Sequence, residues 1–154
     1  AGRVILSEPN PARLAMGRQF GADVLNNPKQ DDLPDLINDL TGGYGVKIGV
    51  EAVGVPQLVA DVSKMIRPRG NLALVGVSPQ GSALPVDLYD FHYKEITMSG
   101  AFGAGDAFGE ALDTLPDLNF TGVVSGRFPL EQTADALEIS AGGNGVKYMI
   151  APHD

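Results

Sequence analysis

The sequence contains no cysteine, and its only two histidines, His92 and His153, lie far apart. Without cysteine there can be no disulfide, no thiolate catalysis and no zinc site built from cysteine. A single histidine among aromatic residues, as at His92, is more typical of packing than of catalysis, because no partner acid or nucleophile accompanies it. We therefore expect neither a metal site nor a catalytic residue within these residues.

Long apolar runs and clustered basic residues are also missing. No apolar run approaches eighteen residues, and no charged leader precedes an apolar segment, so we expect no membrane span, no secretion and a cytoplasmic protein. Lys and Arg number 11 against 19 Asp and Glu, which gives a net charge of −8. Binding to phosphate backbones needs clustered Lys and Arg, so we do not expect a nucleic-acid partner.

The residues that are present favour one α/β domain. The chain has 154 residues, of which 44% are apolar, enough for a substantial core. Apolar strand-type runs alternate with segments of helical period, which predicts a parallel sheet covered on both faces. Strands are expected at 3–7, 22–25, 46–53, 71–77, 96–102, 123–128 and 146–150, and helices at 11–20, 33–40, 56–66, 106–115 and 130–141. The stretch between Ser78 and Glu95 is expected to be a loop.

Glu8 is the first candidate functional residue. The apolar run that begins at Arg3 ends in this one carboxylate, and a helix follows. Nucleotide-binding βαβ units use an acid in this position to hold the hydroxyls of a ribose. On this stretch alone the alternative is equally good, namely a solvated acid at the turn or in the first helical turn, where the helix dipole favours it.

Small residues follow several predicted strands, in the segments that begin at Ala52, Val75 and Ser99. In an open parallel sheet the ligand crosses the carboxyl ends of the strands, where small residues let backbone amides approach it. The alternative is that these glycines only form ordinary turns after the strands and bind no ligand. A further glycine-rich stretch, from Gly103 to Gly109, has its third glycine one residue late for a dinucleotide fingerprint, and we interpret it as a turn.

Seven segments together resemble the C-terminal half of the medium-chain dehydrogenases, and most of all the zinc-dependent polyol, threonine, butanediol and alcohol dehydrogenases. The resemblance keeps the family's order and covers essentially the whole chain. The segments are Glu8-Pro-Asn-Pro-Ala-Arg-Leu14, Phe20-Gly-Ala-Asp23, Glu51-Ala-Val-Gly-Val-Pro56, Ile66-Arg-Pro-Arg-Gly70, Leu74-Val-Gly-Val77, Lys94-Glu-Ile-Thr-Met-Ser-Gly100 and Arg127-Phe-Pro-Leu130.

The resemblance implies a set of cofactor-binding residues. Glu8 would accept hydrogen bonds from the adenosine ribose, and Arg13 would lie near the adenine edge. Because a carboxylate at Glu8 would repel the 2′-phosphate of NADP, the implied cofactor is NAD. The other implied residues line the cleft or flank the nicotinamide: Val53, Gly54, Val75, Gly76, Val77, Gly100, Ala101 and Phe102.

The resemblance also implies that the fold is an incomplete Rossmann-type doubly wound sheet. The family's first strand and its glycine-rich loop would precede Ala1, and the zinc ligands would belong to a catalytic domain further upstream. We therefore expect residues 1–122 to be a partial NAD-binding domain and residues 123–154 to return toward that catalytic domain. Zinc is expected only there, and this chain alone is expected to be inactive.

The implied function is the cofactor-binding portion of an NAD-dependent, zinc-type dehydrogenase of small alcohols or polyols. Family members commonly pair the edge strand at 96–102 across a two-fold axis, so a homo-oligomer is also expected. Two alternatives stay open at this point. One is a zinc-independent quinone or enoyl reductase that uses NADPH, and the other is a non-redox nucleotide-binding module of the methyltransferase type.

Overall fold

The computed structural model describes residues 2–103, 107–143 and 145–153. Helices alternate with strands, and every strand pair is parallel, which confirms the predicted α/β class. The contacts divide the chain into two compact units, one of Ala1–Leu33 with Glu110–Asp154 and one of Pro34–Gly109. No helix in the described ranges is long and apolar enough to cross a membrane.

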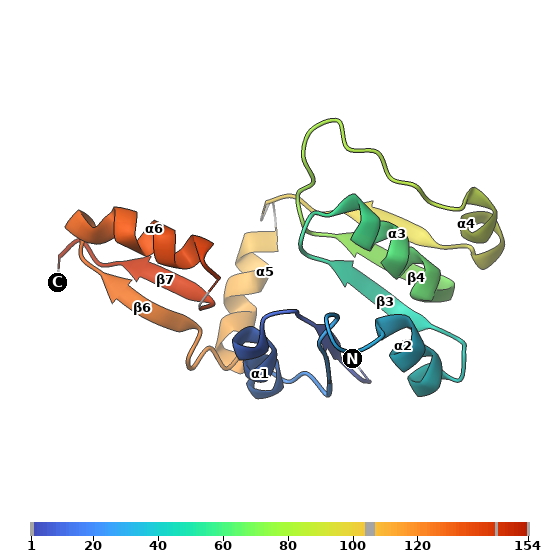
Figure 1. Cartoon of the computed structure of the whole chain (residues 1–154), viewed down its shortest axis with the longest axis horizontal. Helices are drawn as coiled ribbons and strands as arrows, with labels where there is room; N and C mark the ends of the chain where they lie inside the picture. The colour runs from blue at the N-terminus through green and yellow to red at the C-terminus, as the bar shows by residue number, and fades with distance from the viewer. Residues whose placement is uncertain (1, 104–106, 144, 154) are drawn as a thin grey trace. The chain divides into compact units, whose positions relative to one another are not determined.

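Figure 1 shows the elements in their chain order. They are β1 (Ile5–Ser7), α1 (Pro11–Gln19), β2 (Val24–Asn26), α2 (Leu33–Thr41), β3 (Val46–Glu51), α3 (Pro56–Met65), β4 (Ile66–Leu74), α4 (Leu88–Lys94), β5 (Thr97–Gly100), α5 (Ala107–Thr114), the 3₁₀ turn η1 (Leu115–Asp117), β6 (Val124–Phe128), the 3₁₀ turn η2 (Leu130–Gln132), α6 (Thr133–Ala141) and β7 (Lys147–Ile150).

The unit Pro34–Gly109 is built on a three-stranded parallel sheet in the order β3-β4-β5. Helix α3 begins with Pro56 in its first turn, where the missing N–H is not needed, and packs on β3 and β4 (Figure 1). Val59, Ile66 and Leu72 form the centre of the core. This sheet therefore gains its main apolar contacts from one helix.

The opposite face of β3 is open. Successive side chains of a strand point to opposite faces, and Gly49 faces Val62 of α3. Ile48 and Val50 consequently point away from α3, and both are exposed. At Ile48 and Val50, this face of β3 therefore lacks the cover that the sequence predicted for both faces of the sheet.

The other unit contains two parallel strand pairs, β1-β2 and β6-β7. Helix α1 connects the first pair and packs closely on it, because a Cβ at Gly17 would overlap the Leu6 side chain. Asn10 caps α1 by accepting from the amides of Ala12 and Arg13. Among the described residues β1 pairs with β2 alone and β3 with β4 alone, so each has one strand edge without a partner.

The predicted strands and helices are otherwise present with small shifts at their ends, but two sequence predictions were wrong. The expected loop after Ser78 contains α4, which Asp87 caps by accepting from the Tyr89 amide at 2.9 Å. Within α4, Lys94 pairs with Asp90 one helical turn earlier, at 3.0 Å. The polar cap and this ion pair stabilise α4. The prediction missed the helix because its apolar residues show only weak helical periodicity.

The second error concerns the start of β4. Residues 67–70 were expected only to end the preceding helix, whereas β4 already begins at Ile66 and its register with β3 shifts between Val46 and Ile48. Arg69 sits there in the left-handed region at φ 58° and is paired with Glu95, at φ 51°. The Arg69 guanidinium lowers the pKa of the Glu95 carboxyl through a hydrogen bond and charge attraction.

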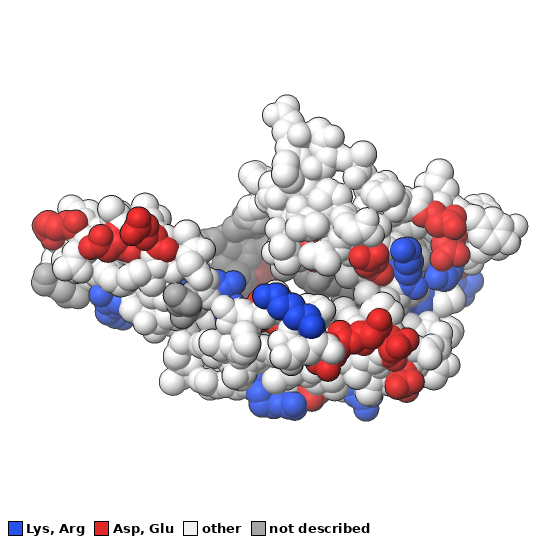
Figure 2. Space-filling view, viewed as in Figure 1, with Lys and Arg blue, Asp and Glu red and all other residues white. Residues whose placement is uncertain are grey.

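Charged side chains are distributed unevenly on the surface. Figure 2 shows acidic side chains over α2 and over α6, while Lys and Arg are dispersed on the same face. The division of the chain into a partial NAD-binding domain at 1–122 and a returning segment at 123–154 stays a prediction. Asp106 and part of the glycine-rich stretch from Gly103 lie outside the described residues.

We expect Leu72→Ala to destabilise the unit Pro34–Gly109 by about 2 to 5 kcal/mol, because Leu72 is fully buried and its removal leaves a cavity. Leu88→Ala is the matched control, since Leu88 is 75% exposed in the same unit, and it should change stability by less than about 0.5 kcal/mol. Urea unfolding followed by circular dichroism measures both. Equal effects of the two substitutions would contradict the assigned core.

Candidate functional site

The carboxyl ends of β3, β4 and β5 lie in register. Glu51 pairs with Leu74, and Leu74 pairs with Gly100. The pairing continues past the strands, because the amides of Val75 and Ala101 donate to the carbonyls of Glu51 and Leu74, at 2.8 and 2.9 Å. The turns that follow the three strands therefore leave the sheet at one edge, which we call the carboxyl edge.

Eight of the ten predicted cofactor-binding residues lie at this carboxyl edge. Glu8 and Arg13 belong to the other unit and are described separately below. The eight residues are Val53, Gly54, Val75, Gly76, Val77, Gly100, Ala101 and Phe102.

The first two turns touch each other through their backbones. A Cβ at Gly76 would overlap the Gly54 amide nitrogen and lie 2.6 Å from the Val53 backbone, and a Cβ at Gly54 would overlap the Val77 carbonyl. Gly54 also has φ 88°, which other residues rarely adopt. These two glycines are therefore required for contact between the turns. Gly100 differs, because a Cβ there would meet nothing within 4 Å, so its backbone faces open space.

Large apolar side chains at the carboxyl edge are unusually exposed. Val53 is 70%, Val77 74% and Phe102 92% exposed. Single exposed apolar residues are common, but several that converge at the ligand-binding edge of a parallel sheet indicate a surface that another molecule or segment covers.

Glu51 is a residue of this edge that sequence reasoning did not single out. Its side chain is only 3% exposed, and its carboxylate accepts from the Val53 and Gly54 amides, each at 2.9 Å. The sequence contained a pattern that could have pointed to Glu51, because an apolar strand ends in this carboxylate much as one leads up to Glu8.

Glu8 follows β1 and is half-buried. Its amide donates to the Asn26 carbonyl at 3.1 Å, and its Oε1 accepts from the Asn10 amide at 2.7 Å. Its second oxygen, Oε2, has no hydrogen bond to any other described residue. Glu8 thus lies before helix α1, and its role as a ribose-binding acid stays a prediction.

Arg13 lies in the first turn of α1 and is already engaged. Its Nε donates to the Gly145 carbonyl at 3.0 Å, while the neighbouring Asn10 Nδ2 donates to the Gly143 carbonyl at 2.8 Å. These bonds attach the start of α1 to the segment between α6 and β7. A role of Arg13 at the adenine edge stays a prediction.

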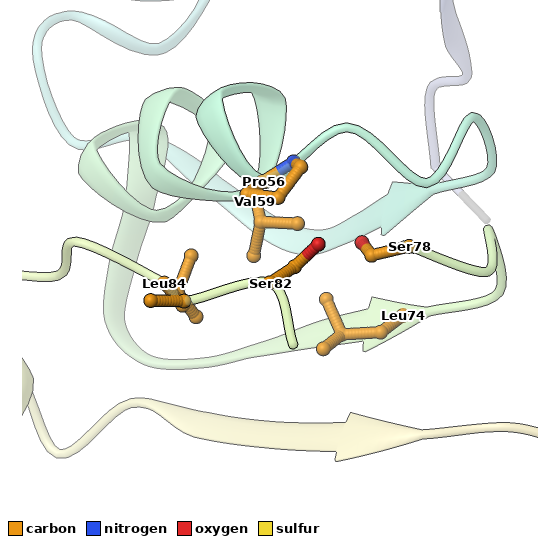
Figure 3. Close-up of a pocket in the computed structure, with 7 residues that line it drawn as sticks. Pro56, Val59, Leu74, Ser78, Ser82 and Leu84 are labelled. Atoms are coloured by element: carbon orange, nitrogen blue, oxygen red, sulfur yellow. The ribbon is translucent and has the colours of Figure 1, made fainter. Parts of the chain in front are cut away.

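A small cavity lies beside the carboxyl edge, between α3 and the residues after β4 (Figure 3). Its volume is about 190 Å³, below the roughly 300 to 1,000 Å³ of typical ligand pockets. Figure 3 shows the side chains of Ser78 and Ser82 directed toward each other there. The cavity is too small for a dinucleotide. Its lining consists of Pro56, Val59, Leu74, Ser78, Ser82, Ala83 and Leu84.

The side chains that the structure describes do not form a zinc site. Within the described parts of the chain, no three His, Cys, Asp or Glu side chains are grouped so that they could hold a metal ion. The sequence has no cysteine at all. No step that requires zinc is assigned to these residues.

Comparison with known proteins identifies the family. The sequence pattern of the zinc-binding dehydrogenase family matches residues 1–117. The chain belongs to this family. An L-threonine 3-dehydrogenase of Legionella pneumophila (strain Corby) is 28% identical over 153 residues, which are 97% of this chain and 44% of the relative. A sorbitol dehydrogenase of Bacillus subtilis is 27% identical over 140 residues, 90% of this chain and 39% of the relative.

Solved structures agree with the fold. A zinc-binding dehydrogenase from Sinorhizobium meliloti 1021, in a crystal structure with NADP bound, superposes with a TM-score of 0.88 at 23% identity. The superposition covers 99% of this chain and 46% of that protein. The chain thus has the Rossmann-type dehydrogenase fold and spans less than half the length of the relatives it matches. Membership of this family favours a dehydrogenase over a methyltransferase-like module.

We expect Gly76→Ala to destabilise the unit by about 1 to 3 kcal/mol or to prevent its folding, because the new methyl group would overlap the backbone of the Val53–Gly54 turn. Gly100→Ala, at the same edge but in open space, should stay within about 0.5 kcal/mol of the original protein. Thermal unfolding of the two variants compares them directly. A tolerated Gly76→Ala would show that the turns do not touch.

Proposed function

We propose that this chain is the NAD-binding portion of a zinc-type alcohol or polyol dehydrogenase. The observation that carries the proposal is the carboxyl edge, where three in-register strands end in turns with exposed Val53, Val77 and Phe102. Glu8, at the carboxyl end of β1 with one oxygen available, supports the same function. When bound, NAD would accept a hydride from the substrate carbon or return one to it.

The residues of this chain would bind and orient the cofactor. Glu8 would accept hydrogen bonds from the adenosine ribose, and the backbone of the turns at Val53 and at Val75 to Val77 would flank the nicotinamide. Gly100 would allow close approach, and Phe102 would help to exclude water.

NAD is the cofactor we propose over NADP. A carboxylate at Glu8 would lie close to the 2′-phosphate of NADP, and two negative charges in a partly buried site repel each other. The relative from Sinorhizobium meliloti was crystallised with NADP, but at 23% identity it informs the fold alone. A measured preference for NADPH would instead favour the zinc-independent reductase alternative.

We propose a small alcohol or polyol as the substrate, since the matched relatives are named threonine and sorbitol dehydrogenases. Any zinc would be held by the catalytic domain that the family resemblance implies, and no group of donors among the described residues forms a metal site. A cytoplasmic location and the absence of nucleic-acid and membrane partners remain predictions.

Replacing Glu8 by Ala should weaken NAD binding by about 1 to 3 kcal/mol, because charge-assisted hydrogen bonds to the ribose are lost. The same change should reduce the discrimination against NADP. Glu131→Ala is the control, because Glu131 is an exposed glutamate of the same unit. Calorimetric titration with both cofactors measures the effect, and unchanged affinities for both in Glu8→Ala would refute the role of Glu8.

We further propose that two copies associate through β5. This strand pairs only with β4 among the described residues, so its other edge can pair with a second copy across a two-fold axis. Thr97→Lys should then favour monomers, because a lysine on an edge strand opposes pairing between edges. Sedimentation velocity should show a lower mass than for Thr121→Lys, which places the same change in the other unit. Equal masses for the two variants would exclude this edge as the interface.

A further inference from the structure

Glu51 is a buried carboxylate whose hydrogen bonds all run to the backbone of the turn that follows it. Oε1 accepts from the Val53 and Gly54 amides at 2.9 Å, and Oε2 accepts from the Gly54 amide at 3.1 Å. No described Lys, Arg or His forms an ion pair with it. A buried carboxylate without hydrogen bonds would be strongly destabilising, so these two amides are essential to its placement.

The backbone of Glu51 reaches the second turn. Its carbonyl accepts from the Val75 amide at 2.8 Å and from the Gly76 amide at 3.0 Å. One residue therefore holds the turn after β3 with its side chain and the turn after β4 with its main chain. The two turns also touch each other directly, through their backbones at Gly54 and Gly76.

The exposed side chains at the carboxyl edge depend on this arrangement. Val53 is 70% and Val77 74% exposed, so packing of their own side chains does not hold them in place. Their positions follow from the backbone that carries them. A change at Glu51 would thus move the surface of the edge although Glu51 itself is buried.

Glu8 and Glu51 show how one sequence pattern serves two purposes. Glu8 directly follows the parallel strand β1 and Glu51 ends β3, and each accepts from an amide two residues later, Asn10 in one case and Val53 in the other. Glu8 is half-buried and keeps one oxygen without a described partner, whereas both oxygens of Glu51 are used. Glu51 is consequently unavailable to a ligand.

We propose that Glu51 is a positioning residue that fixes the turns at 53–54 and 75–77 against each other and thereby sets the affinity of the carboxyl edge for a nicotinamide dinucleotide. The cofactor part of this inference rests on the function proposed above. Glu51 does not touch the cofactor, and its effect passes through the amides of Val53 and Gly54.

The test uses the 154-residue chain and Glu51→Gln. Glutamine has nearly the same shape but replaces one acceptor oxygen by an NH₂ donor, which would face an amide that also donates. Ile66→Val is the matched control, because Ile66 lies in the core of the same unit and loses only a methylene group. Measurements are made at a temperature where circular dichroism shows all three proteins to be folded.

Two measurements separate a positioning role from general stability. Hydrogen exchange followed by NMR should show the amides of Val53 and Gly54 exchanging about tenfold faster in Glu51→Gln, because a charge-assisted hydrogen bond is lost, while amides in the middle of β3 and β4 keep their rates. The Kd for NADH, measured by its fluorescence, should rise by about tenfold in Glu51→Gln and by less than about twofold in Ile66→Val.

Each result decides a different part of the inference. Unchanged exchange at Val53 and Gly54 would overturn the positioning role. Faster exchange with unchanged NADH affinity would overturn its link to the cofactor, as would equal losses of affinity in Glu51→Gln and Ile66→Val. If the unsubstituted chain bound no NADH, the proposed function would fail together with the cofactor part, while the exchange comparison would still decide whether Glu51 fixes the turns.

Discussion

The alignment of three parallel strands at their carboxyl ends is the constraint on which the rest of the site depends. Glu51, Leu74 and Gly100 lie side by side, so the turns after β3, β4 and β5 leave the sheet together. The first two turns are close enough that only glycine fits at Gly54 and Gly76. The same closeness brings the exposed side chains of Val53 and Val77 together from two separate turns.

The sequence predicted most of this arrangement because the relevant signals are local. The apolar run before Glu8 and the proline at the start of the next helix are enough to place β1 and α1. The apolar run that begins at Val46 and the proline at the start of its next helix place β3 and α3 in the same way. The helix α4 escaped prediction because its stability comes from the Asp87 cap and the Lys94 to Asp90 pair rather than from an apolar stripe. The early start of β4 escaped because a register shift with β3 is a property of two strands and not of one.

Glu8 and Glu51 differ in a way that the sequence alone does not predict. Both residues follow the same pattern, and the resemblance to dehydrogenases strengthened the assignment of the ribose to Glu8. What separates them physically is burial and the number of amides from which each carboxylate accepts, one for Glu8 and two for Glu51. A pattern along the chain can place an acid at the end of a strand, but it cannot tell how deeply that acid will be buried.

The chain is much shorter than the dehydrogenases it matches, so its residues account for only part of their function. The chain spans 44% of the threonine dehydrogenase and 39% of the sorbitol dehydrogenase that it matches. In the part of the chain that the structure describes, β1 and β3 each have an edge without a partner strand, and Ile48 and Val50 are exposed, so apolar surface and backbone groups are left open there. The carboxyl edge belongs to this chain, whereas cofactor binding there, substrate choice and metal chemistry are proposals.

An NMR titration of the ¹⁵N-labelled chain with NAD tests the central claim most directly. Our account predicts that the amide signals of Val53, Gly54, Val75 to Val77 and Gly100 to Phe102 shift together with those of Glu8 and Asn10, while amides in the middle of the strands stay in place. Saturable shifts confined to other residues, or no shifts from a folded chain at millimolar NAD, would contradict it.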